Sequence, residues 1–207
     1  MNFTPKNIED IIAESITVKT RLMESCMDEI RMCGEALIES LAGGGKLFLC
    51  GNGGSAADSQ HIAAELVVRF RSSVNRPALP ALALTVDPSI ATAGGNDIGF
   101  ENVFARQIEA FGRPGDALIG ISTSGNSTNV GLAMKKAREL GVKTIGLLGC
   151  KGGSLLGLSD LSVVVPSDVT ARVQESHILI GHIWCEMIEA ALFPEIVEAI
   201  PGKKISL

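Results

Sequence analysis

A run of hydroxyl side chains is the feature of this sequence best suited to binding chemistry. Residues 122–127 read STSGNS, and four of them, Ser122, Thr123, Ser124 and Ser127, carry a hydroxyl group. An apolar run precedes them, and the spacing of residues 127–140 predicts a helix after them. Backbone N–H groups at a helix start, with added hydroxyl donors, suit an anion such as phosphate. The alternative is a Ser/Thr-rich turn that only caps the helix.

A glycine-rich loop, residues 51–57 (GNGGSAA), follows an earlier apolar run and opens another predicted helix. It satisfies the G-x-G-x-x-G/A pattern of dinucleotide-binding proteins, but no acidic residue ends a second strand about 20 residues further on. A nicotinamide enzyme is therefore disfavoured. Gly53 and Gly54 are better explained as allowing the backbone to approach a small ligand, whose oxygens Asn52 and Ser55 would bind.

His61 and Glu65 lie four residues apart on that predicted helix, so their side chains share one face. This spacing suits a single metal ion, or a carboxylate base held beside an imidazole. The alternative is structural. Glu65 precedes Arg69 by four residues and could form a surface ion pair, and His61 could be an ordinary interior histidine.

The last predicted helix carries Gln174, His177 and His182. Gln174 and His182 are eight residues apart, which is about 12 Å along an ideal helix and about 80° around it. Both cannot easily reach one ion from one subunit, so a shared site would need a second subunit or an irregular helix. The alternative is that both histidines belong to a buried helix rich in Ile and Leu.

Asn96 and Asp97 lie in a glycine-rich segment, residues 94–102, which we expect to connect two helices. Asp97 could orient a sugar hydroxyl or simply form a turn. By itself the segment does not decide between the two.

Short apolar runs alternate with helix-like segments along the chain, which predicts an α/β fold: a doubly wound, five-stranded parallel sheet flanked by helices. Ligands bind beyond the carboxyl ends of such strands, so the loops after Cys50, Thr85 and Ile121 should converge. The predicted strands are 46–50, 81–85, 117–121, 143–148 and 161–165, and the predicted helices are 55–70, 88–93, 101–111, 127–140 and 170–192.

Residues 7–41 show one continuous helical periodicity, which three glycines end at 43–45. We therefore expect residues 1–207 to form a single domain with an N-terminal helical extension over about residues 1–42. The apolar stripe of this long helix is expected to pack against a copy of itself in an oligomer. Docking on its own sheet is the alternative.

Composition excludes several classes of protein. A formal charge of −5 argues against generic nucleic-acid binding. No apolar run approaches the roughly 20 residues needed to span a bilayer. The five cysteines show no CxxC spacing, and the first residues lack a signal-peptide core, so we expect a reducing cytoplasm and no membrane partner.

Four blocks together resemble the sugar isomerase (SIS) domain family and, within it, the bacterial phosphoheptose isomerases. They keep the same order and approximate spacing, and only residues 194–207 carry no signature. The blocks are GNGGSAADSQHIAAE (51–65), GNDIGFE (95–101), STSGNS (122–127) and TARVQESHILIGH (170–182).

The resemblance implies interconversion of D-sedoheptulose 7-phosphate and D-glycero-D-manno-heptose 7-phosphate, which supplies heptose for lipopolysaccharide core or other surface glycans. It also implies a cytoplasmic homotetramer with sites at subunit interfaces and one zinc ion per subunit. Glu65 would be the base and His182 the acid or proton shuttle. Ala171 departs from relatives that have an acidic residue there. Carried over by motif, the phosphate loop is Ser122, Thr123, Ser124 and Ser127, the other substrate contacts are Asn52, Gly53, Gly54, Glu65, Asn96, Asp97 and Gln174, and the metal ligands are His61, Glu65, Gln174 and His182.

Two non-catalytic relatives of this family are the alternatives. One binds the bacterial replication initiator through the same scaffold, and the other senses sugar phosphates. The first lacks the helix carboxylate and the terminal histidine, and the second needs no metal ligands. The presence of His61, Glu65 and His182 favours catalysis over both.

Overall fold

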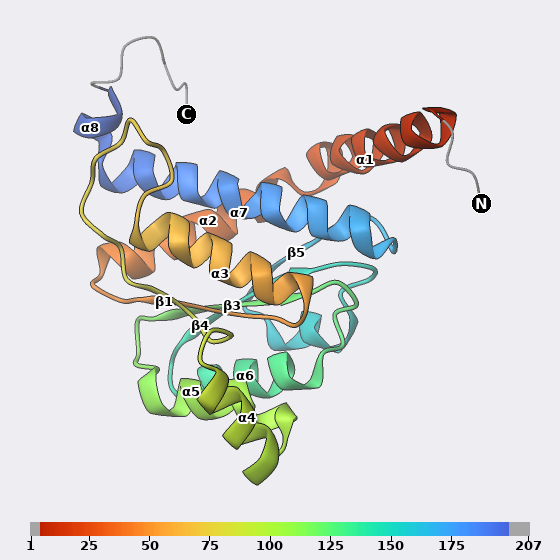
Figure 1. Ribbon diagram of the computed structural model, residues 1–207. Helices are drawn as coiled ribbons and strands as arrows, with labels where there is room; N and C mark the ends of the chain where they lie inside the picture. Colours follow the sequence, from red (N-terminus) through yellow and green to blue (C-terminus); the bar gives the residue numbers. More distant parts are fainter. Residues whose placement is uncertain (1–4, 199–207) are drawn as a thin grey trace.

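The computed structural model describes residues 5–198, which form a twisted sheet between layers of helices (Figure 1). The sheet has five strands, all parallel, in the order β2-β1-β3-β4-β5. The predicted five-stranded parallel sheet is therefore confirmed, with each predicted strand present. The strands are β1 (Leu47–Cys50), β2 (Ala81–Ala83), β3 (Ala117–Ser122), β4 (Lys143–Leu148) and β5 (Leu161–Val164).

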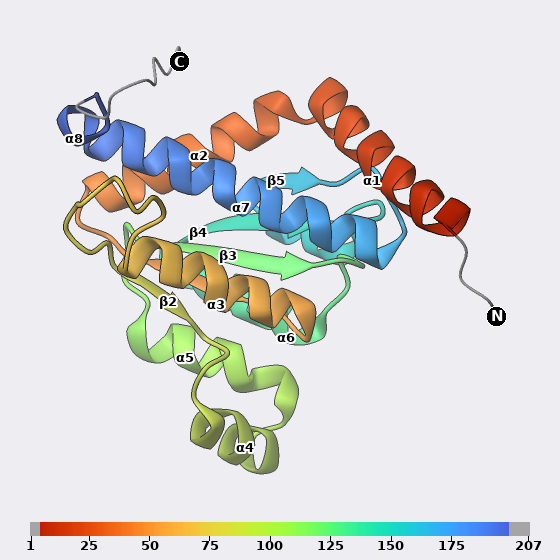
Figure 2. The same ribbon diagram turned by 45° about the horizontal axis from the view of Figure 1, so that its top comes forward.

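Helices cover both faces of the sheet, as Figure 2 shows, which confirms the doubly wound α/β fold. One face carries α2, α3 and α7, and the other carries α5 and α6; each face buries its own apolar cluster. No helix among the described residues is long and apolar enough to cross a membrane. The helices are α1 (Pro5–Ser25), α2 (Met27–Ala42), α3 (Gly54–Val67), α4 (Pro88–Asp97), α5 (Val103–Phe111), α6 (Thr128–Glu139), α7 (Thr170–Leu192) and α8 (Pro194–Glu198), with short 3₁₀ helices η1 (Phe100–Asn102) and η2 (Gly153–Leu158).

The single N-terminal helix predicted over residues 7–41 is wrong, because the chain breaks at Cys26 into α1 and α2. Cys26 leaves the helical region, with φ −131° and ψ 10°. Its buried Sγ lies 3.5 Å from the Val164 carbonyl at the end of β5, so tertiary packing directs the bend. Beyond the bend, α2 packs its apolar stripe on the sheet and on α7. Only α1 projects from the body, and α2 is part of the core.

The connection predicted at residues 94–102 is partly helical. α4 continues through Gly94 and Gly95, so Asn96 and Asp97 form its last turn. Asp87 begins this helix by accepting a hydrogen bond from the Ile90 N–H at 2.9 Å. The two glycines suggested that the helix ends before them. A glycine lowers the stability of a helix but does not exclude one, so the pattern could not show that α4 continues.

The loops that follow β1 and β3 meet at the point where strand order reverses. Asn52 and Asn129 join them by reciprocal side-chain hydrogen bonds of 2.9 and 2.8 Å. Beside them, Thr85 after β2 accepts a hydrogen bond from Gln60 of α3 at 3.2 Å. The predicted convergence of the three loops at this edge is confirmed.

Candidate active site

The loop after β3 is an ordered nest of hydroxyl and backbone groups. Ser122 is buried, and its Oγ lies 2.9 Å from that of Ser127 and accepts from the Gly125 N–H at 3.1 Å. Ser124 is exposed and accepts from the Asn126 N–H at 3.2 Å. Ser127, the residue before α6, makes no side-chain capping hydrogen bond, whereas Asn129 Oδ1 accepts from the Val130 N–H at 2.9 Å in the first turn of that helix. The hydroxyls of the loop and the start of α6 remain suited to an anion.

Gly125 makes the shape of this loop possible. Its φ of +68° is left-handed, and a Cβ at this position would collide with the backbone carbonyl of Gly152. A hollow of about 450 Å³ opens beside the loop and is lined by Ser124, Asn126 and Lys151, among others. Lys151 adds a cation that no local sequence pattern predicts, because it comes from the loop after β4. A larger hollow, about 550 Å³, lies at the opposite edge near Asp116 and Lys143, away from these groups.

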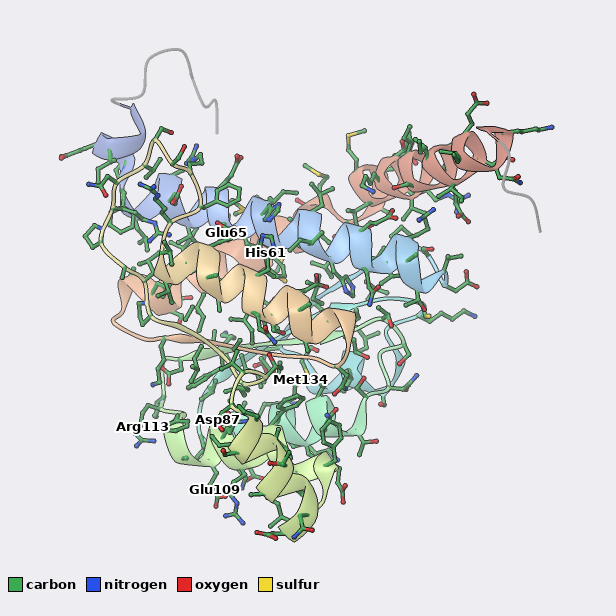
Figure 3. All side chains as sticks on the ribbon, in the orientation of Figure 1. His61, Glu65, Asp87, Glu109, Arg113 and Met134 are labelled. Carbon is green, nitrogen blue, oxygen red and sulfur yellow. The ribbon has the colours of Figure 1, made fainter. Side chains whose placement is uncertain are left out.

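α3 and α7 run side by side in the same direction. At their N-terminal ends, Gly54 faces the amide of Gln174 so closely that a Cβ on residue 54 would require that amide to move. Further along, Ile62 faces Gly181. The pair therefore leads from the loop edge of the sheet along one face of the molecule. Figure 3 shows His61 and Glu65 on α3, between that helix and α7, whereas Asp87, Glu109, Arg113 and Met134 lie on the other side of the sheet.

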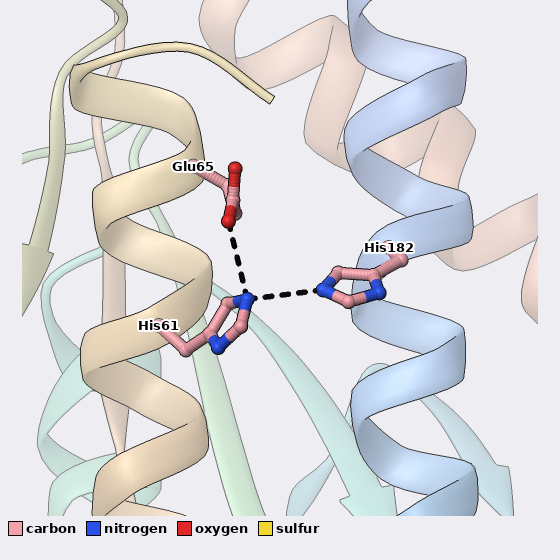
Figure 4. A group of neighbouring side chains, drawn as sticks. All are labelled: His61, Glu65 and His182. Atoms are coloured by element: carbon pink, nitrogen blue, oxygen red, sulfur yellow. Dashed lines mark hydrogen bonds and ion pairs between the residues drawn. The ribbon is translucent and has the colours of Figure 1, made fainter. Parts of the chain in front are cut away.

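Three predicted site residues meet between these helices, as Figure 4 shows. His61 Nε2 lies 3.1 Å from Glu65 Oε1 and 3.1 Å from His182 Nε2. The ligand atoms of all three residues lie within 4.8 Å of one another. Glu65 therefore partners His61 rather than Arg69, and the structural alternatives for His61 and Glu65 do not describe this cluster.

The cluster fits a metal ion better than a set of hydrogen bonds. His61 Nε2 can donate only one proton, yet it faces both a carboxylate oxygen and a second imidazole nitrogen. A tetrahedral zinc ion with bonds of about 2.0–2.1 Å places neighbouring ligand atoms about 3.3 Å apart, close to the distances here. Two imidazoles and one carboxylate, with a fourth position open, form a typical ligand set for a catalytic zinc. The residues present therefore fit the zinc ion that the family resemblance implies.

Gln174 does not join the cluster within one chain. It lies against Gly54 at the loop end of the helix pair, about 12 Å along α7 from His182. Asn52, Gly53 and Ser55 lie at the same end. Glu65 follows Gly54 by eleven residues, about 16 Å along α3, so a single chain keeps the 122–127 loop and this carboxylate at different ends. Asn96 and Asp97 are exposed at the end of α4 and hydrogen-bond to each other at 2.7 Å.

Two further titratable groups flank the cluster. Asp58, one turn before His61, has its pKa raised by burial, which the nearby His61 partly opposes. Its Oδ2 is buried without a hydrogen-bond partner among the described residues. His177 on α7 is fully buried, and burial lowers its pKa to about 4 despite the opposing effect of the Leu148 backbone. For His177, the alternative of a buried core histidine is correct. For His182 it is not, because that side chain faces His61.

Comparison with known proteins agrees with the fold. The SIS domain family model matches residues 12–149. The chain belongs to the SIS domain family.

Within this family the chain is similar to phosphoheptose isomerases. It is 54% identical over 194 residues to the phosphoheptose isomerase of a Roseiflexus species, covering 94% of this chain and 97% of the relative. The solved phosphoheptose isomerase GmhA from Neisseria gonorrhoeae is 42% identical with a TM-score of 0.84, covering 89% of this chain and 98% of that one. The phosphoheptose isomerase from Francisella tularensis is 37% identical with a TM-score of 0.86, covering 90% and 98%. The chain is therefore a sugar isomerase enzyme of the phosphoheptose isomerase group.

Proposed function

We propose that this protein interconverts D-sedoheptulose 7-phosphate and D-glycero-D-manno-heptose 7-phosphate through an enediolate. The observation that carries the proposal is the meeting of His61, Glu65 and His182 on a helix pair that starts beside the hydroxyl-rich loop after β3. An aldose–ketose isomerase needs an anchor for the phosphate and a base for the proton next to the carbonyl. Relatives that are named phosphoheptose isomerase and share 50–54% sequence identity with this chain support the choice of substrate.

The loop end of the helix pair would hold the unreactive part of the substrate. The hydroxyls of Ser122, Thr123, Ser124 and Ser127, with the first turn of α6, would bind the phosphate, and its binding energy would position the reacting end. Sugar hydroxyls would contact the remaining polar groups. These are Asn52, Gly53, Gly54, Ser55, Asn96, Asp97 and Gln174.

The cluster end would carry the proton transfers. Glu65 takes the proton from the carbon beside the carbonyl and returns it to the neighbouring carbon. Because Oε1 faces His61, Oε2 of the same carboxylate remains for this proton. His182 exchanges the proton of the substrate oxygen. Zinc held by His61, Glu65, Gln174 and His182 would polarise the substrate oxygens and stabilise developing negative charge.

We infer that the working unit is a homotetramer with sites at subunit interfaces. Glu65 and the phosphate loop lie at opposite ends of α3, so a neighbouring copy would bring the two together on one substrate. The same arrangement would let Gln174 of one copy reach the cluster of another. α1 supports this assembly, because its projecting face exposes Ile8, Ile12, Ile16 and Met23, each more than half exposed.

A cytoplasmic location follows from the thiol chemistry. All five cysteines, each within the described part of the chain, are free thiols, and four are buried. Neither nucleic acid nor membrane is expected as a partner, given the formal charge of −5. The product would enter the supply of nucleotide-activated heptose for lipopolysaccharide or other surface glycans.

One assay tests the proposal. Purified protein is given sedoheptulose 7-phosphate before chelation, after chelation and after zinc is restored, and the aldose product is followed directly. We expect turnover that chelation removes and zinc restores. Absence of turnover with zinc restored would contradict the proposal and favour a non-catalytic binding role.

A further inference from the structure

A buried ion pair lies behind the cluster, at the C-terminal ends of α3 and α7. Arg76 belongs to the segment between α3 and β2, which Figure 1 shows in yellow beside the end of α7. Its Nε donates to Glu189 Oε1 on α7 at 3.0 Å, and both side chains are completely buried. We propose that Arg76 and Glu189 are positioning residues that fix the Glu65 carboxylate and the His182 ring; this inference rests on the function proposed above.

Arg76 holds the turn of helix that carries Glu65. Its Nη2 donates to the backbone carbonyl of Glu65 at 2.8 Å, and its Nη1 donates to that of Leu66 at 2.8 Å. The last carbonyls of a helix have no partner within the helix, so this guanidinium supplies one. Because one of the two carbonyls belongs to Glu65 itself, the contact restrains the backbone from which the reactive carboxylate extends.

Glu189 reaches the other side of the cluster through Phe70. The Phe70 N–H donates to Glu189 Oε1 at 3.3 Å, and the Phe70 ring lies 5.3 Å from the His182 ring, measured between centroids. Arg71 Nε donates to Glu189 Oε2 at 3.1 Å and completes the set of donors around this carboxylate. One buried carboxylate therefore connects to Glu65 through Arg76 and to His182 through Phe70.

Little space separates the ion pair from the cluster. Burial raises the pKa of the Cys185 thiol to about 12, and the charges of Glu65 and Glu189 both add to the rise while Arg76 opposes it. Cys185 is fully buried, so these charges act on it across the protein interior rather than through water. A shift of the Arg76–Glu189 pair would pass directly to the cluster, because a close-packed interior transmits strain.

A buried ion pair is weak evidence for stability, since an apolar pair of similar volume often stabilises a fold equally well. Stability and positioning can be separated by comparing a variant of this pair with a control variant that breaks a buried ion pair elsewhere. The double variant Arg76→Met/Glu189→Leu removes both charges and keeps most of the volume. Lys46→Met is the matched control, because Lys46 pairs at 2.6 Å with the buried Asp116 at the opposite edge of the sheet.

The experiment measures kcat, KM, thermal midpoint and Co²⁺ affinity, the last from the visible absorption of Co²⁺ bound to the metal-free full-length protein. For the double variant we expect a lower thermal midpoint, because Arg71 and the Glu65 and Leu66 carbonyls lose their partners, together with kcat and Co²⁺ affinity each reduced at least tenfold and KM within about twofold. Lys46→Met should lower the thermal midpoint and leave kcat and Co²⁺ affinity unchanged. A folded double variant with wild-type kcat and Co²⁺ affinity would overturn the inference.

If the double variant does not fold, Arg76→Lys tests the positioning inference. A lysine keeps the charge beside Glu189 but cannot reproduce the planar fork that reaches both carbonyls. We expect kcat and Co²⁺ affinity to fall at least fivefold, and unchanged values would overturn the inference. Failure of the wild type to isomerise the heptose phosphate would instead contradict the proposed function, and the Co²⁺ titration would still test the positioning.

Discussion

The two ends of the α3–α7 pair are built in different ways. At the loop end, the hydroxyl contacts after β3 are local: Ser122, the last residue of β3, reaches Ser127 and Gly125 within five residues, whereas the Asn52–Asn129 pair is long-range. At the cluster end, His61 and His182 meet although 121 residues separate them. The loop depends on backbone geometry and uncharged donors. The cluster depends on titratable side chains brought together by packing of two helices.

This difference separates binding from chemistry. Groups that would bind the phosphate lie far from the reacting carbon. Changes in them should act mainly on KM and on the stability of the loop. Groups at the cluster should act on kcat, because in the proposed mechanism they would contact the reacting atoms. Each prediction below tests whether the two ends can be changed independently.

The largest effect is expected for Glu65→Gln. The amide keeps the shape of the carboxylate but cannot accept the substrate proton, so kcat should fall by about 10³-fold. KM should stay within about twofold, since the phosphate loop is untouched. Steady-state isomerisation measures both, with Glu39→Gln, an exposed change on α2, as control. A near wild-type rate would remove Glu65 from the role of base.

Metal removal is expected to have the next largest effect. Chelation should lower kcat by about 10²-fold while inorganic phosphate still binds at the loop, which calorimetry can measure. His61→Ala should show the same loss, and added zinc should not rescue it, because a ligand is missing. If phosphate affinity fell together with kcat, the two ends would not be independent.

The sequence predicted the parts of the fold that depend on local pattern. Apolar runs and helical spacing gave five strands in a parallel sheet, and parallel topology then required the loops after β1 and β3 to meet, as Asn52 and Asn129 do. The bend at Cys26 was missed, because it depends on packing against β5 that no local pattern records.

The site was predictable only in part for the same reason. Spacing placed His61 beside Glu65 and showed that Gln174 and His182 cannot easily share one ion within a chain. It could not show that His182 faces His61, because that contact depends on how α7 lies against α3. Lys151 and Arg76 were missed for a similar reason: each comes from a loop whose course tertiary packing determines.

Gly125→Ala should damage the loop end alone. The left-handed φ of +68° and the collision with the Gly152 carbonyl should lower the free energy of unfolding by about 2–3 kcal/mol and raise KM. Gly44→Ala is the matched control, because Gly44 has φ +81° but none of the described atoms within 4 Å of an added Cβ. The free energy of unfolding of Gly44→Ala should fall by about 1 kcal/mol, with KM unchanged. Denaturant unfolding measures the free energy of unfolding, and steady-state kinetics measures KM. Equal losses of unfolding free energy in the two variants would show that the collision with the Gly152 carbonyl is relieved.

The smallest effect concerns His177, which lies on α7 between the two ends. Its pKa is about 4 in the folded protein and about 6.5 in the unfolded chain, so the unfolded chain binds more protons between these values. Stability is therefore lost as pH falls from 6.5 towards 4, by about 2 kcal/mol at pH 5 relative to pH 7. Urea unfolding at the two pH values measures this, and His177→Leu should flatten the dependence. An equally steep dependence in that variant would contradict the assignment of this titration to His177.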